Sequence, residues 1–342
     1  MRILLTSHRF YPDIGGIESI SSVLADFFTR SGHSVCLVTQ TCTEPSSDRQ
    51  CSYRILRCPT SSQLVACFQW ADVVLQNNLE VRQLWPLLVC RKPLVIGLQT
   101  WLRTVKGRRT IVQQIKLIAL RTANQLIACS NAVRLDCSPR ATVIGNPYNN
   151  ALFRLAPGVE RRQKIAFLGR LVSDKGADML LRAFAALHPS QWRLTIIGDG
   201  PERAGLEALA NDLGVRHSID FLGSLEGEAL MHTLNEHEIL VVPSLWREPF
   251  GIVALEGMAC GCALLASDGG GLPDAVGSAG LLFRRGDQTD LNSKLLLLSQ
   301  DSYLREQLRE RSTMHLQAFQ QEVVCKRYLT LLEHVTAGAT KC

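Results

Sequence analysis

The most constraining feature of this 342-residue sequence is its alternation of short apolar segments with longer amphipathic ones. The short segments have the length of buried β-strands, and the longer ones carry apolar residues at helical spacing. In the first half the predicted strands are Ile3–Thr6, Ser34–Thr39, Asp72–Gln76, Leu94–Leu98, Gln125–Cys129 and Thr142–Ile144. In the second half they are Lys164–Leu168, Arg193–Ile197, Ile239–Val242 and Ala263–Ala266. This alternation favours α/β domains of the doubly wound type.

A chain of this length exceeds the usual size of a single core and favours two domains. Turn-forming residues cluster at Gly145–Asn150 and predict a break between two alternating blocks. We therefore expect two Rossmann-like domains, residues 1–150 and 151–316, facing across a cleft. Residues Gly16–Arg30 predict the first helix, and a helical pattern over about Gln317–His334 predicts the last.

Composition is that of a globular protein, with 46% hydrophobic and 20% charged residues. No apolar run reaches the roughly 20 residues that span a bilayer, and the opening residues read as a strand rather than a secretory signal. A cytoplasmic location is expected. The twelve cysteines are scattered, several within strand-like runs, and are predicted to be small buried side chains. The pair Cys260 and Cys262 lacks the spacing of a zinc site, so no metal is expected.

Two carboxylates stand eight positions apart in the segment Pro243–Glu256, at Glu248 and Glu256, with Gly251 between them. The pattern places Glu248 in a loop and Glu256 about two turns into the following helix. Free backbone N–H groups at the start of that helix can hold an anion such as a diphosphate. A phosphate site flanked by two carboxylates that bind hydroxyls suits a nucleotide sugar. An ordinary helix start with a buried ion pair is the alternative.

The segment resembles the Glu-x7-Glu motif of family 4 of the glycosyltransferases (GT4), retaining enzymes with the two-domain GT-B fold. Three further segments resemble that family in the expected order: Phe167–Gly176, Ile197–Pro201 and Asp268–Asp274. The likeness covers almost the whole chain and is strongest over about 163–290. It implies that the C-terminal helix, about 317–342, packs back on the first domain.

Two cations are expected to neutralise the departing diphosphate. Arg170 and Lys175 both follow the strand Lys164–Leu168, at the carboxyl edge of the sheet where α/β domains bind ligands. Arginine can clamp two phosphate oxygens, and lysine acts as a point charge. The resemblance makes them the diphosphate-binding pair. An ion pair of Lys175 with Asp174 or Asp178 is the alternative.

The remaining roles in the C-terminal domain are implied by the resemblance. Glu248 accepts hydrogen bonds from donor-sugar hydroxyls and joins Arg170 and Lys175 in the catalytic set. Glu256 binds the ribose. The backbone N–H groups of Phe250, Gly251 and Ile252 face the phosphates.

Three glycine-rich turns are further candidates for the donor site. Gly198 and Gly200 follow a strand and open a helix at Pro201. The run Gly269–Gly271 resembles the family's loop near the donor. In the first domain, Gly15 and Gly16 resemble the family's Gly-Gly loop that closes over the diphosphate. Plain turns, and for Gly15 and Gly16 a simple helix entry, are the alternatives.

One position departs from the family pattern. Members commonly place a histidine after the strand that corresponds to Leu94–Leu98, whereas this chain has Gln99. An amide can donate a hydrogen bond to a sugar hydroxyl or phosphate but cannot carry charge. Retaining transfer by a front-face route needs no enzymatic nucleophile, because the leaving phosphate can accept the acceptor's proton.

The net charge of +6 is unevenly distributed. A basic segment without acidic residues, interleaved with apolar ones, contains Arg103, Lys106, Arg108, Arg109, Lys116 and Arg121. This composition suits the surface of an anionic membrane. A solvated helix whose apolar side faces the core is the alternative. No nucleic-acid-binding motif accompanies the charge.

The sequence thus predicts a retaining, metal-independent glycosyltransferase without a cofactor, with a UDP- or GDP-linked sugar as donor. The expected acceptor is a glycan or a polyprenyl-diphosphate-linked sugar at the inner face of the membrane, in bacterial surface polysaccharide biosynthesis. A non-catalytic nucleotide-sugar-binding subunit and a sugar-nucleotide epimerase remain alternatives.

Overall fold

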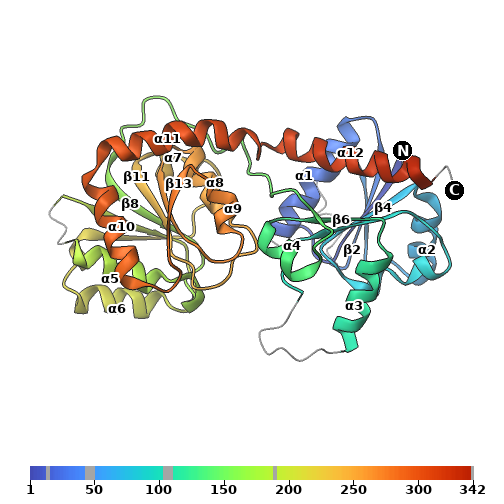
Figure 1. Cartoon of the computed structure of the whole chain (residues 1–342), viewed down its shortest axis with the longest axis horizontal. Helices are drawn as coiled ribbons and strands as arrows, with labels where there is room; N and C mark the ends of the chain where they lie inside the picture. Colours follow the sequence, from blue (N-terminus) through green and yellow to red (C-terminus); the bar gives the residue numbers. More distant parts are fainter. Residues whose placement is uncertain (13–15, 43–50, 103–110, 188–190, 340–342) are drawn as a thin grey trace. The chain divides into compact units, whose positions relative to one another are not determined.

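The computed structural model describes residues 1–12, 16–42, 51–102, 111–187 and 191–339, with the side chains of 111, 112 and 339 not described. The chain divides into two compact units (Figure 1). The N-terminal unit comprises Met1–Asn146 and Gln321–Cys342, and the C-terminal unit comprises Pro147–Gln320. The division falls within the turn-rich segment Gly145–Asn150.

The N-terminal unit is built on a seven-stranded parallel sheet with the order β3-β2-β1-β4-β5-β6-β7. Its strands are β1 (Arg2–Ser7), β2 (Ser34–Thr39), β3 (Arg54–Arg57), β4 (Val73–Asn77), β5 (Leu94–Leu98), β6 (Gln125–Ala128) and β7 (Thr142–Val143). Its helices are α1 (Gly16–Arg30), α2 (Ser61–Trp70), α3 (Ile111–Thr122), α4 (Asn131–Cys137) and α12 (Gln321–Ala339), with short 3-10 turns η2 (Val81–Gln83) and η3 (Trp85–Leu88). Strands β4 and β5 are buried along their whole length, which explains the apolar sequence of β5 and of the first three residues of β4.

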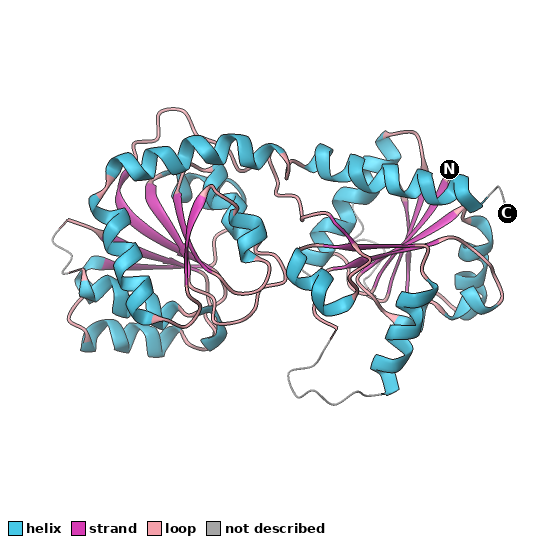
Figure 2. Ribbon diagram, in the orientation of Figure 1, coloured by secondary structure: helices cyan, strands magenta, loops and turns pink. Residues whose placement is uncertain are grey.

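The C-terminal unit has a six-stranded parallel sheet with the order β10-β9-β8-β11-β12-β13. Its strands are β8 (Arg162–Leu168), β9 (Arg193–Ile197), β10 (Ile219–Gly223), β11 (His237–Val242), β12 (Ala263–Ser267) and β13 (Gly280–Phe283). Its helices are α5 (Ala177–Ala186), α6 (Arg203–Asp212), α7 (Gly227–Asn235), α8 (Ile252–Ala259), α9 (Leu272–Val276), α10 (Gln288–Gln300) and α11 (Ser302–Gln317), with 3-10 turns η4 (Ser173–Lys175) and η5 (Arg216–Ser218). Figure 2 shows the strands of this unit between two layers of helices. The core on one side of the sheet includes Phe167, Phe184, Leu265 and Phe283.

The structure confirms the predicted fold class of two Rossmann-like α/β domains with parallel sheets. Every predicted strand is present, but β3, β10 and β13 were missed. All three are edge strands, paired on one side only and less completely buried than the central strands, so they carry a weaker apolar signal.

The last helix differs from its predicted bounds. The pattern over Gln317–His334 spans the end of α11 and most of α12, and residues 318–320 interrupt the two. Helix α12 packs on α1 and β4 of the N-terminal unit. It buries Val324, Cys325, Tyr328 and Leu332.

The prediction that all cysteines are merely buried side chains is wrong for one pair. Cys42, just beyond β2, and Cys58, directly after β3, form a disulfide with a Cα–Cα distance of 5.9 Å. Their spacing of 16 residues belongs to no recognisable disulfide framework, so only the pairing of β2 with β3 reveals it. Seven other cysteines are buried as expected, whereas Cys51 and Cys137 are only half-buried; the buried ones are Cys36, Cys67, Cys90, Cys129, Cys260, Cys262 and Cys325.

Within the described residues, no helix is both long and apolar enough to cross a bilayer.

Candidate active site

The candidate site lies at the carboxyl edge of the C-terminal sheet, where the strand order reverses. Strands β8 and β11 are neighbours, and the chain continues from β8 to one side and from β11 to the other. Loops leaving two such strands diverge and open a crevice in which α/β domains bind ligands. The loop after β8 carries Arg170 and Lys175, and the loop after β11 carries Glu248.

Backbone hydrogen bonds join these two loops. The carbonyl oxygen of Asp174 accepts from the amides of Leu245 and Trp246, each at 2.9 Å. Lys175 is therefore held beside the loop after β11 although some 70 residues separate them in sequence.

Lys175 and Glu248 form an ion pair. Nζ of Lys175 lies 2.5 Å from Oε1 of Glu248, and the side chains are 27% and 15% exposed. The same oxygen accepts a hydrogen bond from the Ser244 hydroxyl at 2.8 Å. The second oxygen, Oε2, has no protein partner among the residues that the structure describes. The cation therefore pairs with Glu248 rather than with Asp174 or Asp178, and the carboxylate keeps an oxygen for a ligand.

The loop after β12 supports Glu248 from the other side. The amide of Gly271 donates to the carbonyl oxygen of Glu248 at 2.7 Å, and Gly270 forms a bridge with the same residue. The run Gly269–Gly271 thus positions the Glu248 backbone and lies beside the candidate site, while its proximity to a bound donor stays a prediction.

Helix α8 begins at this edge with an uncapped end. Its N-cap, Gly251, has a φ of +108°, and no side chain caps the first turn. A Cβ at Gly251 would lie 2.5 Å from Cδ2 of Leu272, so both space and backbone conformation require glycine here. Phe250 is buried and packs on Phe319, with 5.6 Å between ring centroids. The first-turn amides, including that of Ile252, are free of side-chain caps and suited to an anion.

Glu256 lies in the second turn of α8 and is partly buried. Desolvation raises the pKa of its carboxyl to about 7. Among the described residues it has no hydrogen-bond or ion-pair partner. A desolvated carboxylate without a partner is unfavourable, and two hydroxyl donors of a ligand would satisfy it.

Gly198 and Gly200 act through close backbone contact. A Cβ on Gly198 would collide with the carbonyl of Gly169, and one on Gly200 with the carbonyl of Leu171. The amide of Leu171 donates to the carbonyl of Asp199 at 2.9 Å. These contacts fix the loop that carries Arg170. The Arg170 side chain is exposed and makes no ion pair within the described part of the chain.

In the N-terminal unit, the residues predicted to contact the donor have different outcomes. Gly16 is the first residue of α1, whereas Gly15 lies outside the described residues. Gln99 is buried at the end of β5. Its amide nitrogen donates to Oδ1 of Asn77 at 3.1 Å and to Oη of Tyr328 at 3.4 Å. The donors of Gln99 are therefore engaged inside this unit, and its contact with a donor substrate stays a prediction.

Sequence reasoning missed the polar network around Gln99. Asn77 donates to the Ser21 hydroxyl at 2.8 Å, and Ser21 donates to the Ser7 hydroxyl at 3.0 Å. Buried Oε1 of Gln99 has no partner in the described residues. The only indication of this network in the sequence is the presence of polar residues, such as Ser7 and Asn77, at the carboxyl ends of apolar strands.

Other predictions concern metals and the basic segment. Within the described ranges, no three His, Cys, Asp or Glu side chains are placed to hold a metal. Residues 103–110 of the basic segment Arg103–Arg121 lie outside those ranges. In α3, Ile115 and Ile118 are 46% and 59% exposed.

Comparison with known protein families finds a match over most of the C-terminal unit, which carries the candidate site. Residues 154–315 match the family model for Glycosyl transferases group 1. That region contains Arg170, Lys175, Glu248 and Glu256.

Two curated proteins are similar in sequence to part of this chain. An uncharacterized glycosyltransferase of Methanocaldococcus jannaschii is 42% identical over 126 residues, covering 36% of this chain and 32% of that protein. A D-inositol 3-phosphate glycosyltransferase of Corynebacterium jeikeium is 38% identical over 170 residues, covering 46% of this chain and 40% of that protein. The chain thus spans less than half the length of either relative.

Solved structures match almost the whole chain. HepE of Anabaena, in complex with UDP, gives a TM-score of 0.84 at 20% identity and covers 98% of this chain and 100% of its own. Sucrose-phosphate synthase of Thermosynechococcus elongatus gives 0.79 at 21% identity, covering 98% and 99%. The two parallel-sheet units therefore have the GT-B fold.

Proposed function

We propose that this protein is a retaining, metal-independent glycosyltransferase that transfers a sugar from a UDP- or GDP-linked donor. The observation that carries the proposal is the Lys175–Glu248 ion pair at the strand-order reversal of the C-terminal sheet, beside an uncapped helix start. The match of residues 154–315 to group 1 glycosyl transferases supports the reaction class.

A nucleotide sugar accounts for the chemistry of the site. The α8 amides, Lys175 and exposed Arg170 supply positive charge for a diphosphate. Glu256 supplies an unpaired carboxylate for the two hydroxyls of a ribose, and Oε2 of Glu248 an acceptor for a sugar hydroxyl. HepE, which has a similar fold, was solved with UDP-glucose, which supports a donor of this kind.

Transfer breaks the bond between the sugar's anomeric carbon and the β-phosphate oxygen, so negative charge grows on that phosphate. Groups that stabilise this charge more in the transition state than in the bound donor accelerate the step. Lys175, Arg170 and the α8 amides fulfil that role without a metal ion. In the proposed front-face reaction, the leaving phosphate accepts the acceptor's proton and the new bond forms on the face it leaves.

The proposed acceptor is a glycan or a polyprenyl-diphosphate-linked sugar at the cytoplasmic face of the membrane, in surface polysaccharide biosynthesis. The exposed isoleucines Ile115 and Ile118, together with Lys116 and Arg121 of α3, support peripheral contact with anionic lipid.

The test begins with a panel of UDP-, GDP- and ADP-sugars screened by thermal shift, because ligand binding raises the unfolding temperature. Purified protein with EDTA should then hydrolyse or transfer from the bound donor, and NMR of the product should show retained anomeric configuration. Strict dependence on a divalent ion, or inversion, would overturn the mechanism. Donor binding without turnover across an acceptor panel would indicate a binding subunit, and an epimerised donor without acceptor would indicate an epimerase.

A further inference from the structure

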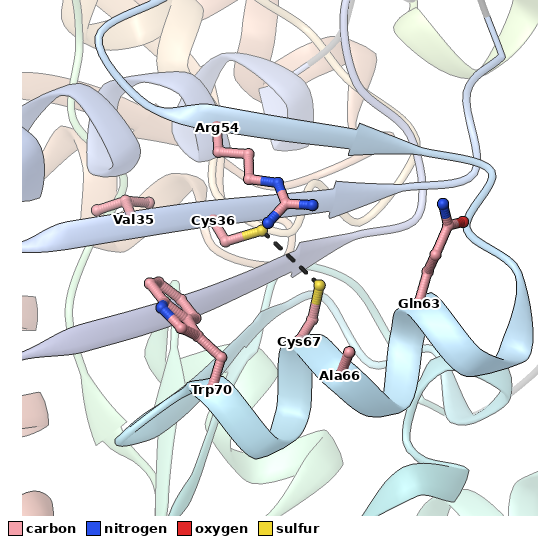
Figure 3. A pocket seen from close by; sticks show the side chains of 7 residues that line it. All are labelled: Val35, Cys36, Arg54, Gln63, Ala66, Cys67 and Trp70. Atoms are coloured by element: carbon pink, nitrogen blue, oxygen red, sulfur yellow. Dashed lines mark hydrogen bonds between the residues drawn. The ribbon is translucent and has the colours of Figure 1, made fainter.

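Two buried thiols face one another in the N-terminal unit. Cys36 lies in β2 and Cys67 in α2, and their sulfur atoms are 4.0 Å apart (Figure 3). A disulfide requires about 2.05 Å between sulfurs, so side-chain rotation and a small backbone adjustment would have to supply roughly 2 Å.

The pair lines a cavity of about 280 Å³. Gln63 and Trp70 of α2 also line it, and Figure 3 shows the guanidinium of Arg54, from β3, on the side of Cys36. This volume is several times the roughly 30 Å³ that a water molecule occupies in the liquid, so a small polar molecule fits. The cavity distinguishes these thiols from cysteines packed into solid core.

The two thiols are chemically unequal. The hydrogen bond with Cys36, together with the charge of Arg54, lowers the pKa of Cys67 against the opposing effect of burial. The same hydrogen bond and burial raise the pKa of Cys36. Burial raises the pKa of Cys262 and of Cys325 to about 12. A thiolate beside a cation and a second thiol is typical of redox-sensitive cysteines.

We propose that Cys67 and Cys36 are a redox-active thiol pair whose cavity admits a small hydroperoxide and which closes into a second disulfide within the N-terminal unit. The Cys67 thiolate attacks one peroxide oxygen, the O–O bond breaks, and the departing oxygen leaves protonated as water or alcohol. The Cys36 sulfur then displaces hydroxide from the Cys67 sulfenic acid and forms the S–S bond. Two thiols are oxidised, and hydrogen peroxide is reduced to two waters.

The test is disulfide mapping of the full chain before and after one equivalent of hydrogen peroxide, with denaturation and blocking of free thiols. Trypsin alone cannot resolve the result, because Cys36 and Cys42 share peptide 31–49 while Cys58 and Cys67 share peptide 58–82. Chymotrypsin cleavage after Leu37 and Leu64 separates the pairs. We expect a peroxide-dependent Cys36–Cys67 peptide beside the existing Cys42–Cys58 link. Fully blocked Cys36 and Cys67 after oxidation would overturn the proposal.

Variants assign the two roles. In Cys36→Ser, a dimedone label for sulfenic acid should accumulate on Cys67, whereas Cys67→Ser should show none on Cys36. Cys90→Ser is the matched control, since Cys90 is 8% exposed against 2% and 6% for the pair. Cys90→Ser should still form the Cys36–Cys67 disulfide with peroxide. If this variant lost the disulfide as completely as Cys36→Ser and Cys67→Ser do, the roles assigned to Cys36 and Cys67 would be wrong.

A charge variant tests the environment of the pair. Arg54→Met should slow formation of the link several-fold, because a nearby cation stabilises the thiolate. Arg57→Met on the same strand should not. Equal rates in both variants would exclude Arg54 from the site.

Discussion

At the scale of single residues, the candidate site contains a cation and a carboxylate that pair with each other and still remain accessible to a ligand. The Lys175–Glu248 pair is partly exposed, which limits its contribution to stability and leaves both groups open to a ligand. Ser244 also donates to Glu248, so the carboxylate would keep one partner if Lys175 turned to a phosphate.

Lys175→Ala should lower the rate of sugar transfer by about 10²-fold or more, as expected when a charge that stabilises the transition state is lost. Arg170→Ala should have an effect of the same order. Single-turnover kinetics with saturating donor measures the loss. Lys164→Ala is the matched control, because Lys164 pairs with Glu236 at 2.7 Å in the same unit. Unchanged rates in both Lys175→Ala and Arg170→Ala would remove these cations from the mechanism.

Glu256 gives a pH-dependent prediction for the unliganded protein. Its pKa is about 7 when folded against an ordinary value of 4.5, so the folded state binds the proton more tightly. Stability therefore falls as pH rises from about 4.5 to 7, by a cost of order 3 kcal/mol. Glu256→Gln should be more stable than the natural protein at pH 8 and equally stable at pH 4, by urea denaturation. The control Glu310→Gln, at an exposed position, should leave the stability unchanged at both pH values. If the stability of Glu256→Gln varied with pH just as that of the natural protein does, the assignment to Glu256 would be contradicted.

The same carboxylate should couple donor binding to a proton. Hydroxyl groups donate to the ionised form, so binding below pH 7 should release a proton and affinity should rise between pH 5.5 and 7.5. Calorimetry in buffers of different ionisation enthalpy measures that release. Glu256→Gln should abolish both effects; release that survives the substitution would point to another group.

At the scale of elements, α8 shows how a short helix becomes an anion site. Its N-cap glycine has no side chain to satisfy the first-turn amides, and Leu272 of α9 leaves no room for one. The loop after β12 then holds Glu248 next to this helix start. Three loops at one sheet edge thus assemble the candidate site.

Gly251→Ala should destabilise the protein by about 1–3 kcal/mol, because alanine disfavours a φ of +108° and meets Leu272. It should also weaken donor binding by shifting the α8 amides. Thermal unfolding and isothermal titration measure the two effects. Gly205→Ala in α6 is the control, since a Cβ there meets nothing within 4 Å and alanine favours helices. Donor affinity unchanged in Gly251→Ala would exclude these amides from the site.

At the scale of the whole molecule, the chain returns to its first unit at the end. Helix α12 packs on α1 and β4, so the N-terminal unit is incomplete without residues that follow the C-terminal unit. Tyr328 is fully buried there, and its hydroxyl oxygen accepts a hydrogen bond from the Gln99 amide. The C-terminal helix therefore belongs to the core of the N-terminal unit.

Tyr328→Ala should cost the N-terminal unit about 3–5 kcal/mol through loss of a large buried ring. Hydrogen exchange followed by mass spectrometry should show faster exchange in α1 and β4 and no change in α5 and β9. Tyr303→Ala in α11 is the control, with a side chain that is 73% exposed. Equal loosening of both units would contradict this division of the core.

Local pattern alone predicted α1 and the central strands β2, β5 and β9 to the residue. A strand buried on both faces is apolar over most of its length, and a helix on a sheet repeats its apolar residues with the helical period. Edge strands such as β3 are only half covered, so their sequences signal less. The resemblance likewise predicts a common site for Arg170, Lys175, Glu248 and Glu256, of which the structure pairs Lys175 with Glu248.

The sequence by itself thus determined the α/β class, the two-unit division and the residue types suited to a nucleotide sugar, because these are local or compositional properties. Only the tertiary structure decided that Lys175 pairs with Glu248, that Gln99 turns to Asn77 and Tyr328, and that Cys36 faces Cys67. Such pairs join positions far apart in the chain. Strand order and backbone packing bring them together, and no spacing along the sequence encodes the distance between them.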